Sequence, residues 1–263
     1  MEKLLIIPTY NERENVEAIL ESVFSLPQNF HVLIIDDGSP DGTAGMVKKC
    51  FDKYPGILFL QERKGKLGLG TAYILGFRWA LAKGYRFIFE MDCDFSHDPR
   101  DLDKLYMACK TGGTDVAVGS RYVKGGNLEN WPWLRVSLSK GASIYTRIIT
   151  LMPVKDPTAG FVCYRREVLE TINLDKISFV GYAFQIEMKF AAWKLGFRIK
   201  EVPITFIDRK YGVSKMNKGI VKEGIFGVLR LKWMSMFKNY RSRVKNISEV
   251  PAYQNTEVIM ERK

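Results

Sequence analysis

Two aspartates, Asp92 and Asp94, follow directly after a largely apolar run at 87–91, and this junction limits the folds open to the chain. Aromatic and β-branched residues fill the run, which is typical of a buried strand. Two carboxylates at its end cannot both belong to a core, because burying unpaired charges is prohibitive. At the carboxyl end of a parallel strand, the chain opens into the crevice where α/β proteins bind ligands. The junction therefore predicts an α/β fold with a ligand site at this edge.

Strand and helix patterns alternate through the first half of the chain. Strands are predicted at 4–8, 32–35, 57–60, 87–91 and 116–119, and helices at 41–54, 71–82 and 99–110. A further helix follows the first strand, where Asn11 is expected to act as the N-cap and Glu14 to complete a capping box. This alternation indicates a mostly parallel, doubly wound sheet flanked by helices.

After Tyr122 the alternation stops. A loop is expected at 124–130, a mixture of aromatic and basic residues fills 131–152, and strands are expected at 161–164 and 199–206 with a helix at 184–195. We expect three parts: a catalytic domain at 1–216, an amphipathic basic segment at 217–245 and a polar tail at 246–263.

Positive charge is concentrated near the C-terminus. The chain has a net charge of +11, and residues 209–245 carry eleven lysines and arginines against the single acid Glu223. Such a segment favours phosphate groups or an anionic membrane surface. At 220–240, Trp233 and Phe237 interleave with cations, which predicts a helix lying on a bilayer; a core-packing helix with a basic outer face is the alternative. A non-enzymatic nucleic-acid binder would also use this charge, but the aspartate pair would repel a nucleic-acid backbone.

The sequence shows no signal peptide and no apolar stretch of about 20 residues that could span a bilayer. The four cysteines lack metal-ligand spacing, which favours reduced thiols. We therefore expect a cytoplasmic protein, bound peripherally to the cytoplasmic face of the membrane.

Polar residues also follow the first two predicted strands. Tyr10, in the segment 8–12, could stack on a base beside a helix N-terminus, although simple strand-to-helix punctuation is the alternative. Asp36 and Asp37 stand where acids commonly accept hydrogen bonds from a nucleotide's base or ribose. An Asp/Ser helix cap is the alternative for that segment.

Three later segments offer phosphate ligands. Residues 66–72 form a glycine-punctuated loop with a lysine before a helix, but they lack the spacing of a P-loop. Arg121 ends a predicted strand, where a planar donor could grip phosphate; a surface salt bridge is the alternative. Residues 208–215 contain three cations, for which a solvated charge run is the alternative.

A hard divalent cation that bridges to phosphate oxygens would satisfy the pair Asp92 and Asp94. The only histidines, His31 and His97, lack zinc-ligand spacing. No G-x-S-x-G elbow or Cys/His constellation indicates a serine or thiol hydrolase. The predicted cofactor is therefore Mg²⁺ or Mn²⁺.

Taken in their order along the chain, these segments resemble the polyprenol-phosphate (dolichol-phosphate) mannose synthases, glycosyltransferases of family 2 with a GT-A fold. The resemblance covers roughly residues 3–216. The matching segments are Pro-Thr-Tyr-Asn-Glu-Arg-Glu-Asn at 8–15, Asp-Asp-Gly-Ser-Pro-Asp-Gly-Thr at 36–43, Lys-Leu-Gly-Leu-Gly-Thr-Ala-Tyr at 66–73, 92–94, 119–122, Asp-Pro-Thr-Ala-Gly-Phe at 156–161, and 208–215.

The resemblance implies roles for individual residues. The residues implied to hold the guanosine end of a GDP-mannose donor are Pro8, Tyr10, Glu12, Ile35 and Asp37. The residues implied to bind phosphate groups are Arg121, Arg209 and Lys215, and Asp92 and Asp94 are implied to bring the metal ion to the diphosphate. Cys93 replaces the alanine of the family's D-A-D motif, and Ser96 replaces a glutamine metal ligand of some relatives. Asp94 and Arg121 are the expected catalytic residues, and Asp156 falls in an acceptor-side motif.

The implied reaction is an inverting transfer of mannose from GDP-mannose to a polyprenyl phosphate, giving the β-linked product and GDP. The acceptor is already an anion, so no general base is needed. Two other enzymes stay open: a glucosyltransferase that uses UDP-glucose with the same lipid, and a sugar nucleotidyltransferase that releases pyrophosphate. Many relatives carry C-terminal membrane spans, for which the basic segment at 217–245 is the expected substitute.

Overall fold

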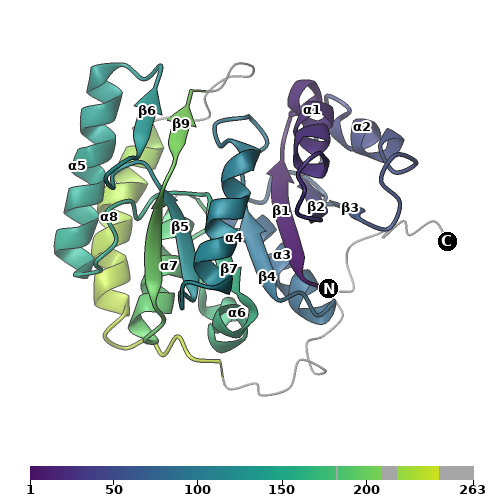
Figure 1. Cartoon of the computed structure of the whole chain (residues 1–263). Coiled ribbons are helices and arrows are strands. Elements are labelled where there is room, and N and C mark those ends of the chain that lie inside the picture. The colour runs from purple at the N-terminus through teal and green to yellow at the C-terminus, as the bar shows by residue number, and fades with distance from the viewer. Residues whose placement is uncertain (182, 209–217, 243–263) are drawn as a thin grey trace.

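The computed structural model describes residues 1–181, 183–208 and 218–242, and its centre is a seven-stranded sheet (Figure 1). The strands stand in the order β3-β2-β1-β4-β7-β5-β8. Six run parallel, and β7 is antiparallel to both of its neighbours. Their bounds are β1 (Lys3–Thr9), β2 (His31–Asp36), β3 (Leu58–Glu62), β4 (Phe87–Glu90), β5 (Val116–Ser120), β7 (Val162–Arg165) and β8 (Ile199–Pro203). The predicted α/β fold with a mostly parallel sheet is confirmed.

Helices cover both faces of the sheet, because successive side chains of each strand point into opposite cores. Leu5 and Ile7 of β1 pack in one core, and Leu4 and Ile6 pack in the other. The first core is covered by α1 (Arg13–Phe24), α2 (Thr43–Lys49) and α4 (Leu102–Lys110), which a 3-10 turn (Pro99–Asp101) precedes. The second is covered by α3 (Leu69–Ala82), α6 (Arg166–Thr171) and α7 (Ala183–Lys194).

The strand predicted at 199–206 is two strands. Pro203 ends β8, because it has no N–H with which to continue the ladder. After Ile204, the chain forms β9 (Thr205–Ile207), which pairs in parallel with β6 (Asn127–Glu129) in a separate two-stranded sheet. The predicted loop at 124–130 therefore contains a short strand, and this small sheet lies beyond the ends of β5 and β8 (Figure 1).

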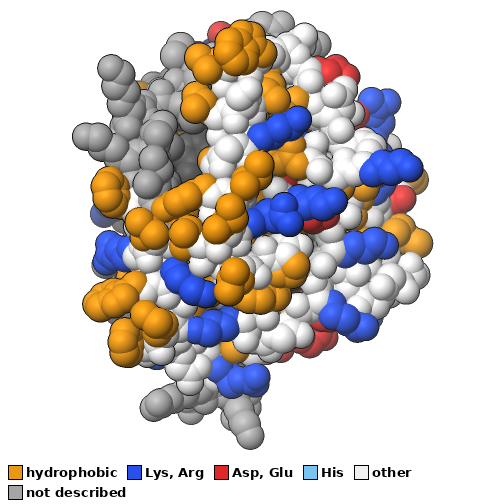
Figure 2. All heavy atoms as spheres, turned by 90° about the vertical axis from the view of Figure 1, so that its left-hand side faces the viewer, with side chains coloured by type: hydrophobic (Ala, Val, Ile, Leu, Met, Phe, Trp, Pro, Cys, Tyr) orange, Lys and Arg blue, Asp and Glu red, His pale blue; other side chains and the backbone are white. Residues whose placement is uncertain are grey.

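The segment 131–152, in which the aromatic and basic mixture assigns no helix or strand, contains α5 (Trp133–Thr150). Helix α8 (Lys218–Met234) lies beside it. Val228 and Leu231 of α8 are buried in the core. Figure 2 shows the outer face of both helices, where apolar side chains gather among lysines and arginines.

The predicted boundaries at 216 and 245 stay predictions, and the tail at 246–263 lies outside the described residues. Within the three described ranges, none of the helices combines the length and apolar character that a bilayer crossing requires.

Candidate active site

The carboxyl ends of β1, β2 and β4 lie together at one edge of the sheet. The parallel register places Pro8 of β1 beside Ile35 of β2, and Ile6 of β1 beside Glu90 of β4. Two residues after Glu90, the chain reaches Asp92. The residues predicted for the nucleotide and those predicted for the metal therefore follow neighbouring strands.

Hydrogen bonds join the loop after β1 to the loop after β2. They also provide acceptors for the N–H groups at the start of α1. Three consecutive N–H groups donate to side chains of the second loop: Asn11 to Ser39 Oγ (2.9 Å), Glu12 to Thr43 Oγ1 (3.0 Å) and Arg13 to Asp41 Oδ2 (3.1 Å). The predicted capping box of Asn11 and Glu14 is wrong: α1 begins after Glu12, Asn11 has a φ of 57°, and the acceptors come from the next loop.

Asp36 is an acceptor inside this edge. Its carboxylate receives hydrogen bonds from Thr9 Oγ1 (2.9 Å) and from both the N–H (2.9 Å) and the hydroxyl (2.6 Å) of Ser39. Helix α2 begins after its N-cap residue Gly42, and Asp41 before it accepts a hydrogen bond from the N–H of Thr43 at 3.0 Å. The Asp/Ser helix cap that was the alternative for 35–39 is wrong: the N-cap of α2 is Gly42, whereas Asp36 and Ser39 join the two loops.

Asp37 forms a buried ion pair with Arg63; the two residues are 6% and 8% exposed. Arg63 Nε donates to Asp37 Oδ1 at 2.6 Å, and its Nη1 donates to Thr71 Oγ1 at 2.7 Å. Burial raises the pKa of Asp37, although the hydrogen bond and charge of Arg63 oppose the rise. None of the sequence motifs includes Arg63. Arg63 does follow β3 directly, and residues after the carboxyl end of a parallel strand are expected to line the ligand site, as for Asp92.

The glycine loop at 66–72 lies against the loops just described. A Cβ at Gly38 would approach the backbone nitrogen of Gly65 to 2.8 Å, so glycine is what lets these segments meet. Lys66 Nζ lies 5.0 Å from the centroid of the Tyr10 ring. The ring predicted to stack on a base and a lysine predicted to meet phosphate are therefore adjacent.

Asp92 and Asp94 lie in the turn after β4, with the buried Cys93 between them. Asp94 is 7% exposed, and its Oδ1 accepts the N–H of Ser96 at 3.1 Å. A Cβ at Gly160 would lie 4.0 Å from Asp92 Oδ2, so this glycine leaves space beside the carboxylate. No group of three or more metal-ligating side chains occurs within 1–181, 183–208 and 218–242. Two carboxylates beside open space fit Mg²⁺ or Mn²⁺, because such ions take few protein ligands and add phosphate oxygens and water.

Two buried ionisable residues lie behind this turn. Lys189 and Glu90 are both 0% exposed. Lys189 Nζ donates to the backbone oxygens of Ala159 (2.6 Å) and Gln185 (3.1 Å). Burial raises the pKa of Glu90 and lowers that of Lys189, and the charge of each partner opposes the other's shift. Because Ala159 precedes Gly160, Lys189 fixes the backbone that borders Asp92.

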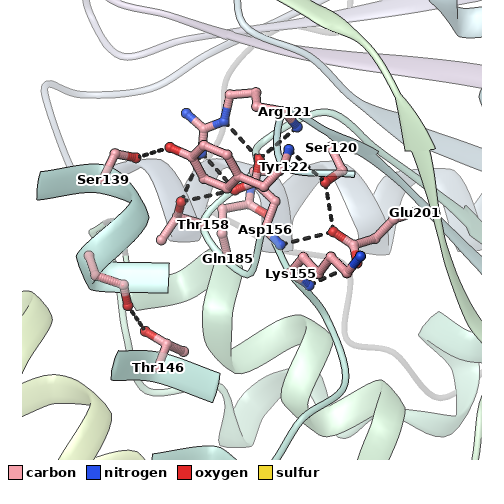
Figure 3. A network of polar contacts seen from close by, with 12 residues as sticks. Ser120, Arg121, Tyr122, Ser139, Thr146, Lys155, Asp156, Thr158, Gln185 and Glu201 are labelled. Atoms are coloured by element: carbon pink, nitrogen blue, oxygen red, sulfur yellow. Dashed lines mark hydrogen bonds and ion pairs between the residues drawn. The ribbon is translucent and has the colours of Figure 1, made fainter. Parts of the chain in front are cut away.

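Arg121, at the end of β5, is gripped by Asp156 (Figure 3). Its Nε donates to Asp156 Oδ2 and its Nη2 to Oδ1, both at 2.7 Å, and Nη2 also donates to Thr158 Oγ1 at 3.0 Å. The predicted alternative, a salt bridge, is present, but it is buried: the side chains are 9% and 0% exposed. Burial opposes the charge of Arg121, yet the hydrogen bonds and charge of Asp156 outweigh it and raise the Arg121 pKa.

Glu201 of β8 anchors the loop that carries Asp156. Its carboxylate accepts hydrogen bonds from Ser120 Oγ (2.7 Å), Lys155 N–H (2.8 Å) and Asp156 N–H (2.9 Å) (Figure 3). The sequence motifs miss this residue too. The sequence gives one indication of Glu201: it is an acidic residue within the segment 199–206, which is predicted as a strand.

His97 is buried between Phe161, whose ring centroid is 4.9 Å away, and Phe206, at 5.1 Å. Burial lowers the pKa of His97 to about 4, although the charge of Asp94 opposes the shift. The imidazole is therefore neutral near neutral pH. Two predicted phosphate ligands, Arg209 and Lys215, lie outside the described residues.

Comparison with known proteins finds a matching family and relatives that resemble most of the chain. The model of the family described as "Glycosyl transferase family 2" matches residues 4–172. A polyprenol monophosphomannose synthase of Mycolicibacterium smegmatis is 46% identical over 225 residues, covering 86% of this chain and 84% of that relative. An undecaprenyl-phosphate mannosyltransferase of Micrococcus luteus is 43% identical over 244 residues, covering 93% and 99%.

Solved structures share the fold at low sequence identity. A mannosyltransferase from Pyrobaculum calidifontis, solved in complex with GDP-Man and Mn²⁺, superposes with a TM-score of 0.57 at 18% identity. The match covers 90% of this chain and 64% of that one.

Proposed function

The chain belongs to glycosyl transferase family 2, and from that membership we propose that it transfers mannose from GDP-mannose to a polyprenyl phosphate, with inversion and with the help of a divalent cation. Membership confirms the expected glycosyltransferase class and GT-A fold. One observation carries the sugar and the lipid: two relatives with 46% and 43% identity, aligned over most of both chains, are named for mannose transfer to polyprenol-type phosphates.

The edge formed by β1 and β2 supports a nucleotide donor. Pro8, Ile35 and Asp37 lie on neighbouring strand ends, and Tyr10 offers a ring beside Lys66. A ring next to a cation suits a base followed by a diphosphate. The buried pair of Asp37 and Arg63 holds these loops in place before any ligand arrives.

Asp92 and Asp94 are the residues that would hold Mg²⁺ or Mn²⁺. When bound, the cation would neutralise negative charge on the departing diphosphate. The chain's own part is positional: Gly160 leaves space beside Asp92, and Lys189 holds the backbone next to it.

The acceptor end requires a phosphate ligand and no base. A phosphate monoester has a second pKa near 6, so it is largely dianionic at pH 7 and can attack directly. His97, neutral, stacked on Phe161 and in edge contact with Phe206, suits a site without a general base. Arg121 is the phosphate-orienting cation of this proposal, and the two bonds from Asp156 fix its guanidinium.

A lipid acceptor also requires access to a membrane. The face in Figure 2 exposes large apolar side chains on α5 and in the segment 226–237, among them Trp133 (78%), Ile148 (66%), Trp233 (63%) and Phe237 (79%). Apolar side chains mixed with cations suit an anionic bilayer surface. Peripheral binding at the cytoplasmic face, proposed from the sequence for 217–245, thus extends to α5.

The experiment is transfer of radiolabelled sugar from GDP-mannose or UDP-glucose into polyprenyl phosphate with added Mg²⁺. We expect labelled lipid from GDP-mannose only, and none when a chelator removes the cation. Labelled lipid from UDP-glucose alone would replace the sugar but keep the reaction class. No labelled lipid from either donor would overturn the proposal and favour the nucleotidyltransferase, which releases pyrophosphate.

A further inference from the structure

The chain that follows α8 lies beside α7 and the segment after α6 (Figure 1). The N–H of Asn173, which follows α6, donates to the carbonyl of Tyr240 at 2.7 Å. Tyr240 is 2% exposed, and its ring meets that of Phe190 in α7 edge to face, with the centroids 6.2 Å apart. Residues 238–242, which we call the C-terminal strap, are therefore packed against the body of the molecule.

Glu187 of α7 joins this strap to the loop before α7. Glu187 is 0% exposed, and its Oε1 accepts a hydrogen bond from Lys238 Nζ at 2.7 Å. Its Oε2 accepts the N–H groups of Ser178 (2.7 Å) and Phe179 (3.0 Å). Lys238 Nζ also donates to Ser178 Oγ at 2.8 Å. A buried carboxylate that loses its cationic partner is strongly unfavourable, so the position of Glu187 depends on Lys238.

The loop that Glu187 holds also supports the glycine loop at 66–72. The Val180 carbonyl accepts the N–H of Gly70 at 2.8 Å, and a Cβ at Gly68 would approach that carbonyl to 3.2 Å. Arg63 Nη2 donates to the Gly68 carbonyl at 3.3 Å, so the glycine loop also contacts the edge of the sheet. A path of direct contacts therefore runs from the strap, through α7, to the loop predicted to bind donor phosphate.

We propose that Glu187 and Lys238 are positioning residues for the nucleotide donor, because they hold the loop at 178–180 against which the glycine loop at 66–72 packs. The inference rests on the proposed function, in which the glycine loop lies beside the diphosphate of the donor. Glycine-rich segments lose much conformational entropy when they are ordered, and ordering them before a ligand binds raises its affinity. Both residues act through contacts within the chain, so donor binding needs no membrane.

The first test is hydrogen–deuterium exchange of the full chain without ligand. Lys238→Met should speed exchange in peptides that cover 66–72 about tenfold and leave those of β1 and β4 unchanged, because the loop before α7 loosens while the sheet stays intact. The matched control is Lys194→Met, which removes the lysine whose bond to the Ser235 carbonyl joins α7 to the chain after α8 without Glu187. This control should leave exchange at 66–72 unchanged.

A double variant separates the proposed route from a general loss of stability. Lys238→Met alone leaves Glu187 buried without a cationic partner. Adding Glu187→Gln removes that charge and keeps a side-chain oxygen for the N–H groups of Ser178 and Phe179. The double variant should therefore recover most of the protection at 66–72, although the strap has lost the same lysine.

The second test is calorimetric titration of GDP in the presence of Mg²⁺. Lys238→Met should weaken GDP binding about fivefold, and the double variant should bind GDP nearly as wild type does. In the transfer assay, the KM for GDP-mannose of Lys238→Met should rise with little change in kcat, because the residue positions the loop and takes no part in the reaction.

The proposal is overturned if Lys238→Met leaves either exchange at 66–72 or GDP affinity at the wild-type value, if Lys194→Met has the same effect, or if the double variant recovers nothing. Failure of the proposed function is a separate outcome: the wild-type protein would then label no lipid from GDP-mannose, whereas the exchange measurement needs neither donor nor lipid.

Discussion

Two regions of the molecule differ in which side chains they bury. One is the edge of the sheet formed by β1, β2 and β3, and the other is the outer face of α5 and α8. At the edge, Asp37 and Arg63 are buried and paired with each other. On the face, Trp133 and Ile148 are exposed, and Lys140 has no acidic partner among the described residues. The edge is therefore complete before a ligand binds, whereas the face is completed by what binds to it. This division suits a water-soluble nucleotide donor on one side and an amphiphilic acceptor on the other.

The largest expected effect lies at the turn after β4. Asp94→Asn keeps an oxygen for the Ser96 N–H but removes the negative charge that would attract the cation. We expect mannosyl transfer to fall by at least about a thousandfold while the melting temperature changes little, because electrostatic stabilisation of the leaving group is lost. Asp52→Asn, an exposed acid of the same chemistry, is the control. Transfer within about tenfold of wild type would show that Asp94 does not hold the cation.

Stability tests the claim that the edge is complete on its own. Arg63→Met leaves Asp37 buried without its partner, and we expect the free energy of unfolding to fall by about 3–5 kcal/mol. The matched surface variant, Lys48→Met, breaks the exposed pair with Glu62 and costs less than about 1 kcal/mol. Urea denaturation measures both. Equal costs would remove the distinction between a buried and a surface pair.

His97 lies in neither of these two regions: it follows the turn after β4, and its ring centroid lies 5.1 Å from that of Phe206 in β9. Burial lowers the pKa of His97 from 6.5 to about 4. Between pH 6.5 and pH 4, His97 is therefore protonated in the unfolded chain but neutral in the folded protein. Acidification across this window therefore lowers the free energy of unfolding, by up to about 3 kcal/mol. His97→Phe keeps the ring and removes this contribution, so its stability falls less between pH 7 and pH 5. Identical pH dependence in both proteins would contradict the account.

The smallest effect is expected on the apolar face. Ile148→Ser removes one exposed side chain and should weaken binding to phosphatidylglycerol-containing vesicles about fivefold, or about 1 kcal/mol. Met107→Ser on α4 is the control, because Met107 is 44% exposed on another part of the surface. Equal losses would show that vesicle binding does not use α5.

Much of the edge could be predicted from the sequence, because it depends on local rules. A buried strand that ends in two carboxylates places Asp92 and Asp94 at the carboxyl end of a sheet, and this held. The direction of β7 could not be predicted, since a buried strand reads alike in either direction.

Contacts between residues far apart in the sequence were the hardest to predict. Arg63 reaches Asp37, and Glu201 reaches the N–H of Asp156, across 26 and 45 residues. The cap of α1 failed for the same reason, because its acceptors come from the following loop. Helix α5 was missed because many of its apolar side chains, such as Ile148, face outward, so they do not mark a core-facing stripe.

The most direct test of this account is calorimetric titration of GDP-mannose into the purified full chain with Mg²⁺, with and without phosphatidylglycerol-containing vesicles. If the edge is complete on its own, GDP-mannose binds without lipid, needs the cation, and keeps its affinity when vesicles are added. Binding that requires vesicles would contradict the account, because the donor site would then depend on the α5 and α8 face.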